Sequence, residues 1–491
     1  MINNYKETGR VMPLKIYNVL GREKQDFVPL EPGRVGMYVC GPTVQDYAHL
    51  GHAKTYLSFD MIVRYLRFTG CDVLYVQNLT DVGHLLDSGE DRILKKAAQV
   101  QAKPMQIVEY YTRSYFEDMD ALGVVRPDIS PRASGHVPEQ IKMIETLIAK
   151  GHAYEANGSV YFDVTTAPDY GKLSNRRIET QAAGSREAVR DEKRHPEDFA
   201  LWKKAEPEHI LRWESPWGEG FPGWHIECSA MAKKYLGPTF DIHGGGVDNI
   251  FPHNESEIAQ SECANDADFA RYWILVGSLT VDGIKMSKSL GNFITIKDAL
   301  KQHRPEVIRM FVYSAHYSSP VDYTSESLTA AANGWERLYG AVRLARQMKN
   351  DAPEGDAGNG ILPRLDETRR DFLAAMDDDF NSPKAIAALQ ELTRDVNTLL
   401  NSGAAVGRSV LEAIETTYRE LGGDVLGLIP AAEAAGGDSR REAGLIGLLI
   451  SLRAEARKNR DFATSDRIRD ELKALGVILE DRPDGTVWRT N

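Results

Sequence analysis

The sequence has few cysteines, no long apolar run and no excess of basic residues. Its four cysteines are widely scattered among 491 residues, which excludes a disulfide framework and favours a reducing cytoplasm. No run of about 18 apolar residues occurs, so a membrane-spanning helix is excluded. Residues 1–10 lack the apolar segment of a secretory signal. We therefore expect a cytoplasmic protein.

Acidic residues outnumber basic ones. The chain carries 71 Asp and Glu against 59 Lys and Arg, a formal net charge of −12. This balance argues against a general nucleic-acid coat, which needs concentrated positive charge, but permits a folded RNA held on a few basic patches. The hydrophobic content of 42% is typical of a soluble globular protein. The length predicts about three or four domains.

The first part of the chain shows strand–helix–strand patterning. Residues 35–40 predict a short buried strand, and apolar residues at helical spacing then continue from His49 to Gly70, which is well placed as a C-terminal cap. Residues 72–79 are β-branched and apolar, as in a buried parallel strand. This βαβ unit indicates a doubly wound, Rossmann-like α/β fold.

The same sheet is predicted to resume after an insertion. Helical segments extend to about residue 150, a strand is expected at 158–164, and a polar, loop-rich region continues to about residue 220. Strand signals return at 239–246 and 272–279. The sheet is therefore expected to be split by the inserted segment.

The C-terminal part is predicted to be mainly helical. Breaks occur at 351–360 and 430–439, with helical patterning between them. Helices are expected again over 443–475, and the chain ends in a hairpin with Asp484 and Gly485 at its turn. We therefore expect a helical bundle followed by a small α+β domain.

Two histidines stand where the first helix is predicted to begin. His49 and His52 are three residues apart, with Gly51 between them. Such a pair is more often a cap or a solvated face than a metal site, and zinc would need further ligands. In a doubly wound fold, however, backbone N–H groups and the helix dipole attract anions at this position. We therefore favour phosphate binding, with Gly51 admitting a nucleotide to the backbone.

A second segment supports phosphate binding. Residues 283–291, G-I-K-M-S-K-S-L-G, place Lys285 and Lys288 in a glycine-flanked loop. A lone K-x-x-K is usually a solvated surface feature, but mobile amines suit a developing pyrophosphate. Together with H-L-G-H upstream, the segment resembles a class I aminoacyl-tRNA synthetase, in which the two motifs bracket ATP. Between them lies G-G-G-V-D, whose glycines would admit adenine and whose Asp248 would bind ribose hydroxyls.

A third group of residues has the composition of a zinc site. Cys40 ends the first strand, Cys228 follows in G-W-H-I-E-C-S-A-M, and His253 and Glu257 lie one helical turn apart. These four make a plausible tetrahedral set, although spacing alone favours two buried free thiols beside an exposed helix. Because Cys40 and His253 come at strand ends beside the expected ATP cleft, position strengthens the zinc hypothesis.

The sequence motifs around the candidate zinc ligands resemble those of the cysteinyl-tRNA synthetase family. They are M-Y-V-C-G-P-T-V, G-W-H-I-E-C-S-A-M and D-I-H-G-G-G-V-D, and similar stretches occur at 158–175, 198–204, 377–385 and in the tail. The resemblance implies a zinc ion that binds the substrate thiol and is held by Cys40, Cys228, His253 and Glu257. Zinc binds thiolate strongly and a hydroxyl weakly, which separates cysteine from serine where an apolar pocket would not.

The resemblance also implies roles for the other residues. The catalytic residues acting on ATP and Mg²⁺ would be His49, His52, Lys285 and Lys288. Nucleotide contacts are implied for Thr43, Gly51, Gly244, Gly245, Gly246, Asp248 and Lys288, and amino-acid contacts for Gly41, Asn78, Thr80 and Trp224.

Two segments depart from the family's pattern. His253 is followed by Asn254, where the family usually has a second histidine. The stretch after Asp81, V-G-H-L-L-D-S-G-E-D, differs from the commoner I-D-D-K form. Cys71 and Cys263 match no ligand position, and we expect them to be structural.

The resemblance predicts an ATP-dependent ligase that joins L-cysteine to tRNA(Cys) through a cysteinyl-adenylate. One alternative is a ligase of the same fold that couples cysteine to an amino sugar; it lacks the anticodon-reading part, so residues 440–491 argue against it. The other is a non-catalytic RNA-binding paralogue, against which the intact motifs argue. We expect a monomer with no membrane partner.

The resemblance also implies five parts along the chain. The Rossmann-like catalytic domain would comprise 1–115 and 221–300, separated by a connective insertion at 116–220. The remaining parts would be a stem-contact region at 301–325, a helical tRNA-binding bundle at 326–430 and a small anticodon-binding domain at 440–491.

Overall fold

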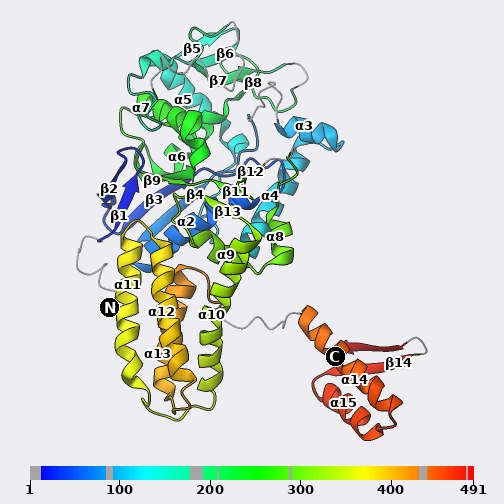
Figure 1. Ribbon diagram of the computed structural model, residues 1–491. Coiled ribbons are helices and arrows are strands. Elements are labelled where there is room, and N and C mark those ends of the chain that lie inside the picture. The colour runs from blue at the N-terminus through cyan, green and yellow to red at the C-terminus, as the bar shows by residue number, and fades with distance from the viewer. Residues whose placement is uncertain are drawn as a thin grey trace. The chain divides into compact units, whose positions relative to one another are not determined.

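Figure 1 shows the computed structural model of the chain, which describes residues 13–83, 92–176, 192–206, 209–286, 290–430, 439–482 and 485–490. The chain divides into two compact units, Met1–Ile429 and Pro430–Asn491. None of the helices in the described ranges combines the length and the apolar character that crossing a lipid bilayer requires.

A parallel sheet of four strands lies at the centre of the first unit (Figure 1). Its strand order is β10–β9–β3–β4, and its members are β3 (Arg34–Val39), β4 (Asp72–Gln77), β9 (Phe240–Gly246) and β10 (Ala270–Val276). Strands β9 and β10 come more than a hundred residues after β4, yet β9 pairs with β3 and β10 pairs with β9, so the sheet is split and resumed, as predicted. The α/β fold class is thereby confirmed.

Helix α2 (Leu50–Phe68) connects β3 to β4 and covers the sheet. Most of its apolar side chains are buried, among them Leu57 and Ile62, which are fully so. The N–H of Thr69 donates to the carbonyls of Tyr65 and Arg67, and Gly70 follows with a φ of +95°. Glycine adopts this conformation without the steric penalty of a Cβ atom, so the predicted C-terminal stop is confirmed.

The insertion between β4 and β9 carries helices and a second sheet. The helices are α3 (Arg92–Gln99), α4 (Pro104–Ala121) and α5 (Val137–Ala149). The antiparallel sheet contains β5 (Ala153–Ala156), β6 (Ser159–Phe162), β7 (Phe199–Lys204) and β8 (Gly220–Pro222). The prediction that a loop-rich region continues to about residue 220 was therefore wrong for β7, while β8 begins where that region was expected to end. Five of the six β7 residues are buried, so that strand lacks the polar–apolar alternation of a half-exposed strand.

Further elements surround the central sheet. Helices α6 (Trp224–Leu236) and α7 (Glu255–Asn265) flank β9 along the chain, and the N-terminal hairpin is β1 (Lys15–Asn18) with β2 (Glu23–Asp26). After β10 come a small sheet and two helices, namely β11 (Leu279–Val281), β12 (Ile284–Lys285), β13 (Val321–Tyr323), α8 (Ile296–Gln302) and α9 (Pro305–Tyr313).

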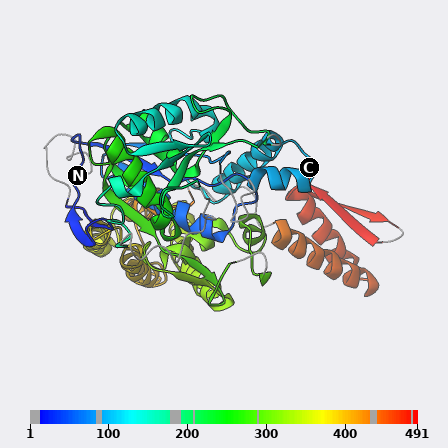
Figure 2. The ribbon, with the colours of Figure 1, turned by 90° about the horizontal axis from the view of Figure 1, so that it is seen from above.

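A helical bundle completes the first unit. It consists of α10 (Ser325–Lys349), α11 (Leu362–Asp377), α12 (Ser382–Leu400) and α13 (Arg408–Tyr418), and in Figure 2 the yellow helices are seen end-on. Leu57 of α2, Phe311 of α9 and Leu389 of α12 belong to one continuous apolar core. The bundle is therefore packed directly against the part that carries the sheet.

The second unit has its own small core. It contains α14 (Ser439–Lys458), α15 (Phe462–Ala474), β14 (Val477–Arg482) and β15 (Gly485–Thr490). Ile446, Leu472 and Val477 pack together, as the α+β prediction requires. Gly485 pairs with Arg482 as the first residue of β15, and the predicted turn residue Asp484 lies outside the described residues.

Replacement of Gly244 by alanine should destabilise the first unit. A Cβ atom there would lie 2.3 Å from Cζ of Phe59, so α2 would have to move away from β9. We expect a loss of ~1–3 kcal/mol in the free energy of unfolding, measured by urea denaturation. The control is Gly340→Ala inside α10, where a Cβ meets nothing within 4 Å. That variant should gain ~0.5–1 kcal/mol, and equal effects of the two substitutions would contradict the close-packing argument.

Candidate functional site

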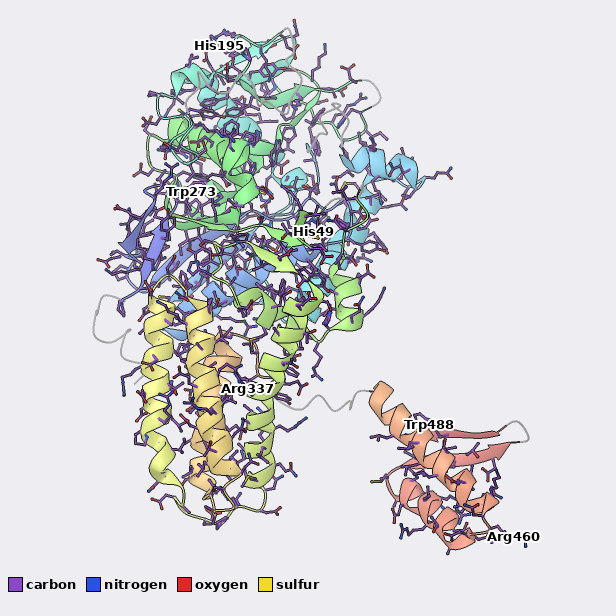
Figure 3. The ribbon with its side chains drawn as sticks, viewed as in Figure 1. His49, His195, Trp273, Arg337, Arg460 and Trp488 are labelled. Atoms are coloured by element: carbon purple, nitrogen blue, oxygen red, sulfur yellow. The ribbon has the colours of Figure 1, made fainter. Side chains whose placement is uncertain are left out.

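A cleft of about 350 Å³ opens where the strands of the central sheet end. Its lining comes from the residues that follow each strand: Cys40–Thr43 after β3, Asn78 and Thr80 after β4, Gly246–Asn249 at β9 and Val276–Leu279 at β10. The lining also includes His49 and His52 at the α2 start, Lys285 of β12, Trp224 and Cys228 of α6, and His253. Ligands of doubly wound folds gather at this edge of the sheet. Figure 3 labels His49 here and Arg337 in the bundle.

The two histidines cap helix α2. Nδ1 of His49 accepts the N–H of Gly51 at 3.0 Å, and Nδ1 of His52 accepts the N–H of His49 at 3.2 Å. Their rings lie 3.9 Å apart. A neutral imidazole that accepts at Nδ1 carries its hydrogen on Nε2, so each ring offers a donor at Nε2.

The environment keeps His52 neutral. Burial, together with the neighbouring His49, lowers the pKa of His52 well below its usual value. A Cβ atom on Gly51 would lie 2.8 Å from Cε1 of His49. The glycine therefore gives the His49 ring room to fold back over the start of the helix. Capping uses Nδ1 of each ring, so it occupies a different nitrogen from the Nε2 that the phosphate hypothesis requires.

Lys285 and Asp248 face each other in the part of the cleft near the start of α2. Nζ of Lys285 lies 2.9 Å from Oδ1 of Asp248, and both side chains are exposed. Exposed ion pairs contribute ~0–1 kcal/mol, so an incoming anion or hydroxyl can compete for either partner. Lys288, the second lysine of the predicted pair, lies outside the described residues.

The three glycines of G-G-G-V-D differ in position. Gly246 lines the cleft, whereas Gly244 and Gly245 are not part of its lining. Gly244 lies against the ring of Phe59, and a Cβ on Gly245 would come 3.6 Å from Cβ of Cys40. Gly244 thus serves the packing of α2 on β9, while Gly246 is the glycine of the three that faces the cleft.

Four buried side chains converge on one side of the cleft. Their potential ligand atoms all lie within 4.8 Å of one another, and they belong to Cys40, Cys228, His253 and Glu257. Oε2 of Glu257 lies 4.0 Å from Sγ of Cys40 and 3.6 Å from Nε2 of His253. The structure therefore brings together the same four residues that the sequence predicted as zinc ligands.

The protonation of this group suits a cation. Burial by itself would raise the pKa of Glu257, but the imidazoles of His243 and His253 and the hydrogen bonds that it accepts lower this pKa to about 2. The hydrogen bond between the two thiols lowers the pKa of Cys40 to about 6 and raises that of Cys228. A carboxylate and one thiolate are thus favoured within a buried site.

Neighbouring side chains orient these potential ligands. The amide nitrogen of Asn254 donates to Oε2 of Glu257 at 2.7 Å, and Nε2 of His243 lies 3.1 Å from Oε1 of the same carboxylate. Nδ1 of His253 lies 3.1 Å from Nδ1 of His225, which leaves Nε2 of His253 to face Glu257. Trp273, labelled in Figure 3, stacks on His243 with ring centroids 4.1 Å apart. Asn254, in the place of the family's second histidine, thus supports the carboxylate directly.

The residues predicted to contact the amino-acid substrate lie beside the four potential metal ligands. The N–H of Gly41 donates to Oδ1 of Asn78 at 2.8 Å, and Nδ2 of Asn78 donates to Oγ1 of Thr80 at 3.1 Å. Trp224 stacks on the ring of His253 with centroids 4.2 Å apart. Thr43, predicted as a nucleotide contact, pairs with Thr80 in a β-bridge and lines the same cleft.

Three polar residues of the site were not identified from the sequence. They are His225, Glu227 and His243, all buried. Oγ1 of Thr80 donates to Oε2 of Glu227 at 3.0 Å, while His225 and His243 contact the potential ligands. All three occur in the sequence motifs G-W-H-I-E-C and D-I-H-G-G-G. The presence of His and Glu in otherwise apolar or glycine-rich motifs is the signal that could have identified them.

The donor set fits zinc. Two thiols, an imidazole and a carboxylate are ligands that zinc accepts in tetrahedral sites. A tetrahedral ion at about 2.0–2.3 Å from its ligands separates them by about 3.3–3.8 Å, so the observed 3.6 and 4.0 Å require little movement. Further hydrogen bonds to the carboxylate are the outer support that metal ligands usually have.

Comparison with known proteins agrees with this geometry. Residues 26–333 match the family described as the tRNA synthetases class I (C) catalytic domain, residues 371–430 match the DALR domain, and residues 448–489 match the cysteinyl-tRNA ligase anticodon binding domain. The fold is similar to that of the methionyl-tRNA synthetase of Mycobacterium tuberculosis in complex with methionyl-adenylate, with a TM-score of 0.57, 16% identity and coverage of 80% of this chain and 89% of that one. It is also similar to LeuRS of Agrobacterium radiobacter, with a TM-score of 0.59, 12% identity and coverage of 82% and 85%. The catalytic part is that of a class I tRNA synthetase.

Relatives at higher identity narrow the assignment. The cysteine–tRNA ligase of Deinococcus radiodurans is 51% identical over 97% of this chain and 96% of its own length. That of Chlorobium luteolum is 50% identical over 97% and 99%. The chain belongs to the cysteine–tRNA ligase family, and it is therefore an enzyme of the ligase class.

Loss of the Asn254 amide should weaken metal binding. Asn254→Ala removes a donor to Glu257 and leaves the carboxylate less firmly oriented. We expect zinc affinity to fall about tenfold to a hundredfold, measured by competition with a chromogenic chelator. The control is Asn401→Ala, because the side-chain amide of Asn401 donates to the backbone of its own helix. Unchanged zinc affinity in Asn254→Ala would show that the amide does not support the site.

Proposed function

We propose that this chain joins L-cysteine to tRNA(Cys) in an ATP-dependent reaction through a cysteinyl-adenylate, with zinc-mediated recognition of the substrate thiol. The observation that carries the proposal is the position of the Cys40, Cys228, His253 and Glu257 cluster, three members of which line the same cleft as His49 and His52. A thiol selector and an anion-binding helix start thus flank one cleft.

The nucleotide half of the cleft would hold ATP and its Mg²⁺. The Nε2 donors of His49 and His52 would bind phosphate oxygens, and Lys285 and Lys288 would neutralise the departing pyrophosphate. The cysteine carboxylate is already ionised and needs no base to attack the α-phosphate. Positioning and charge stabilisation would therefore supply most of the acceleration. A ribose hydroxyl of the terminal tRNA adenosine would then attack the adenylate carbonyl.

Selectivity for cysteine follows from the chemistry of the donor set. A bound zinc ion would ligate a substrate thiolate but bind a serine hydroxyl weakly. The chain's own contribution is to keep the four ligands buried and oriented. Trp224, which stacks on His253, and the Asn78–Thr80 pair would confine the rest of the small substrate.

We further propose a division of labour among the parts of the chain. The catalytic domain would comprise 1–115 and 221–300, with the connective insertion at 116–220. The stem-contact region would be 301–325, the tRNA-binding bundle 326–430 and the anticodon-binding domain 440–491. The match of residues 448–489 to an anticodon binding domain supports tRNA, not an amino sugar, as the acceptor. We infer a cytoplasmic, monomeric enzyme.

Cysteine-dependent ATP–pyrophosphate exchange tests the proposed adenylation. The parent protein should exchange with cysteine and at least about a hundredfold less well with serine, since each ~1.4 kcal/mol of discrimination is a factor of ten. Cys228→Ser should lose zinc and raise the KM for cysteine at least about tenfold, while the KM for ATP changes by less than about twofold.

The matched control for this variant is Cys263→Ser, because Cys263 is a partly buried thiol outside the ligand set. It should behave like the parent. If Cys228→Ser weakened cysteine and ATP binding equally, the proposed role of the metal in selectivity would be wrong.

Deletion of residues 440–491 should separate the two half-reactions. Every residue that lines the cleft belongs to the first unit, so pyrophosphate exchange should stay near the parent rate. The kcat/KM for charging tRNA should fall about tenfold to a hundredfold, because contacts to the distal tRNA are lost. Circular dichroism would verify that the shortened chain is folded. Equal loss of exchange and charging would contradict an anticodon-reading role for this segment.

A further inference from the structure

The turn between helices α11 and α12 adopts an uncommon conformation. Asp379 and Phe380 both have positive φ values, 66° and 53°, which residues with a Cβ atom rarely adopt. Phe380 is fully buried and its ring contacts that of Tyr65 on α2. The turn is therefore held in place by its surroundings, and these surroundings belong to the part that carries the sheet.

Asp379 makes four bonds across that junction. Its carboxylate accepts the N–H of Tyr17 at 2.9 Å and the O–H of Tyr317 at 2.7 Å, both at Oδ1. Its own N–H donates to the carbonyl of Lys15 at 3.0 Å, and its carbonyl accepts from Nε2 of His316 at 2.8 Å. Because Asp379 is only 2% exposed, water can hardly replace these partners. The bundle is thus tied to the segment 316–319.

The segment 316–319 lies directly against the rim of the cleft. The carbonyl of Tyr317 accepts the N–H of Gly277 at 2.9 Å. A Cβ atom on Gly277 would lie 2.5 Å from the carbonyl oxygen of Ser318 and 2.6 Å from that of Ser319, so the two backbones are in contact. Gly277, Ser278 and Leu279 line the cleft. A shift of the 316–319 segment must therefore move this rim.

A buried lysine closes the connection to the histidine helix. Lys54, two residues after His52, is 1% exposed. Its Nζ donates to the carbonyls of Ser319 and, at 3.5 Å, of Ser278. Both acceptors are neutral carbonyls, so the ammonium group depends on them for its solvation. The start of α2, the rim at Ser278 and the 316–319 segment are consequently joined at one point.

We propose that Asp379, Tyr317 and Lys54 are positioning residues through which the helical bundle sets the geometry of the nucleotide half of the cleft. This inference rests on the proposed function in one respect, namely that the cleft binds ATP. The contacts run without interruption from the bundle turn, through the Asp379–Tyr317 bond and the 316–319 backbone, to Gly277 and to the helix that carries His49 and His52.

The test compares two buried tyrosines in the full-length protein. Tyr317→Phe removes the bond to Asp379, and Tyr418→Phe removes a bond of similar length, 2.8 Å to Oγ1 of Thr393, inside the bundle. In pyrophosphate exchange, Tyr317→Phe should raise the KM for ATP about threefold to tenfold, as expected for one lost buried hydrogen bond, with the KM for cysteine unchanged. Tyr418→Phe should leave both KM values at the parent level, although its Tm falls. Equal KM values for ATP in the two variants would overturn the proposal.

A second variant guards against a folding defect in the first. Lys54→Met keeps a long side chain but removes the ammonium group, and it should raise the KM for ATP with the same selectivity over cysteine. If Tyr317→Phe does not fold, Lys54→Met decides the test: a selective rise in the KM for ATP supports the proposal, and an unchanged KM for ATP refutes it.

Direct binding of ATP, measured by equilibrium dialysis without cysteine, separates this proposal from the proposed function. If the parent binds ATP and Tyr317→Phe binds it more weakly, the proposed positioning role stands even if cysteine-dependent exchange is absent and the proposed function fails. If the parent does not bind ATP, both proposals fail. If both tyrosine variants bind ATP as tightly as the parent, the positioning role alone fails.

Discussion

A carboxylate without solvent contact governs the arrangement of this cleft. Glu257 is fully buried, and a buried charge is tolerated only where partners compensate for lost hydration. Its partners come from different elements: His243 from β9, and His253 and Asn254 from the short helical segment Ile250–Asn254 before α7. Moving any one of these elements would leave the charge partly uncompensated. The compensation therefore holds β9 and α7 together beside Cys40, and the possible metal site is a consequence of that constraint.

The two sides of the cleft differ in the kind of charged group that each can bind. The side that holds the two thiols is buried and contains the Glu257 carboxylate, which suits a soft cation. The side at the start of α2 presents N–H donors of imidazoles at a helix start, an arrangement that suits an anion. Close packing keeps the two sides adjacent, because Gly244 lets the ring of Phe59 approach β9 without a side chain between them. Helix α2 thereby places His49 in the same cleft as Cys40.

The helical bundle also contributes to the structure around the cleft. It shares an apolar core with helices α2 and α9, and its α11–α12 turn is hydrogen-bonded to the segment behind the cleft rim. A family model for the DALR domain covers residues 371–430, which include that turn. The second unit differs in this respect, because it has an apolar core of its own.

Much of the fold could be predicted from local signals. The strands at β3, β4, β9 and β10 are short apolar runs, and α2 has helical spacing with a terminal glycine, so each is visible in its own sequence. β7 and β8 were missed because one is buried on both faces and the other has three residues, and neither leaves an alternating pattern. Asn254 was noted as a departure from the family, but its bond to Glu257 depends on rotamers that no pattern shows.

By itself, the sequence determined the chemistry available to this protein and the local elements that carry it, because caps, apolar periodicity and ligand types depend on neighbouring residues. Only the tertiary structure decided which distant groups meet. Cys40 and Glu257 are 217 positions apart, and Asp379 and Tyr317 are 62 apart. Their contacts result from strand pairing and core packing over the whole unit. The distance between two residues along the chain does not show whether this packing brings them together.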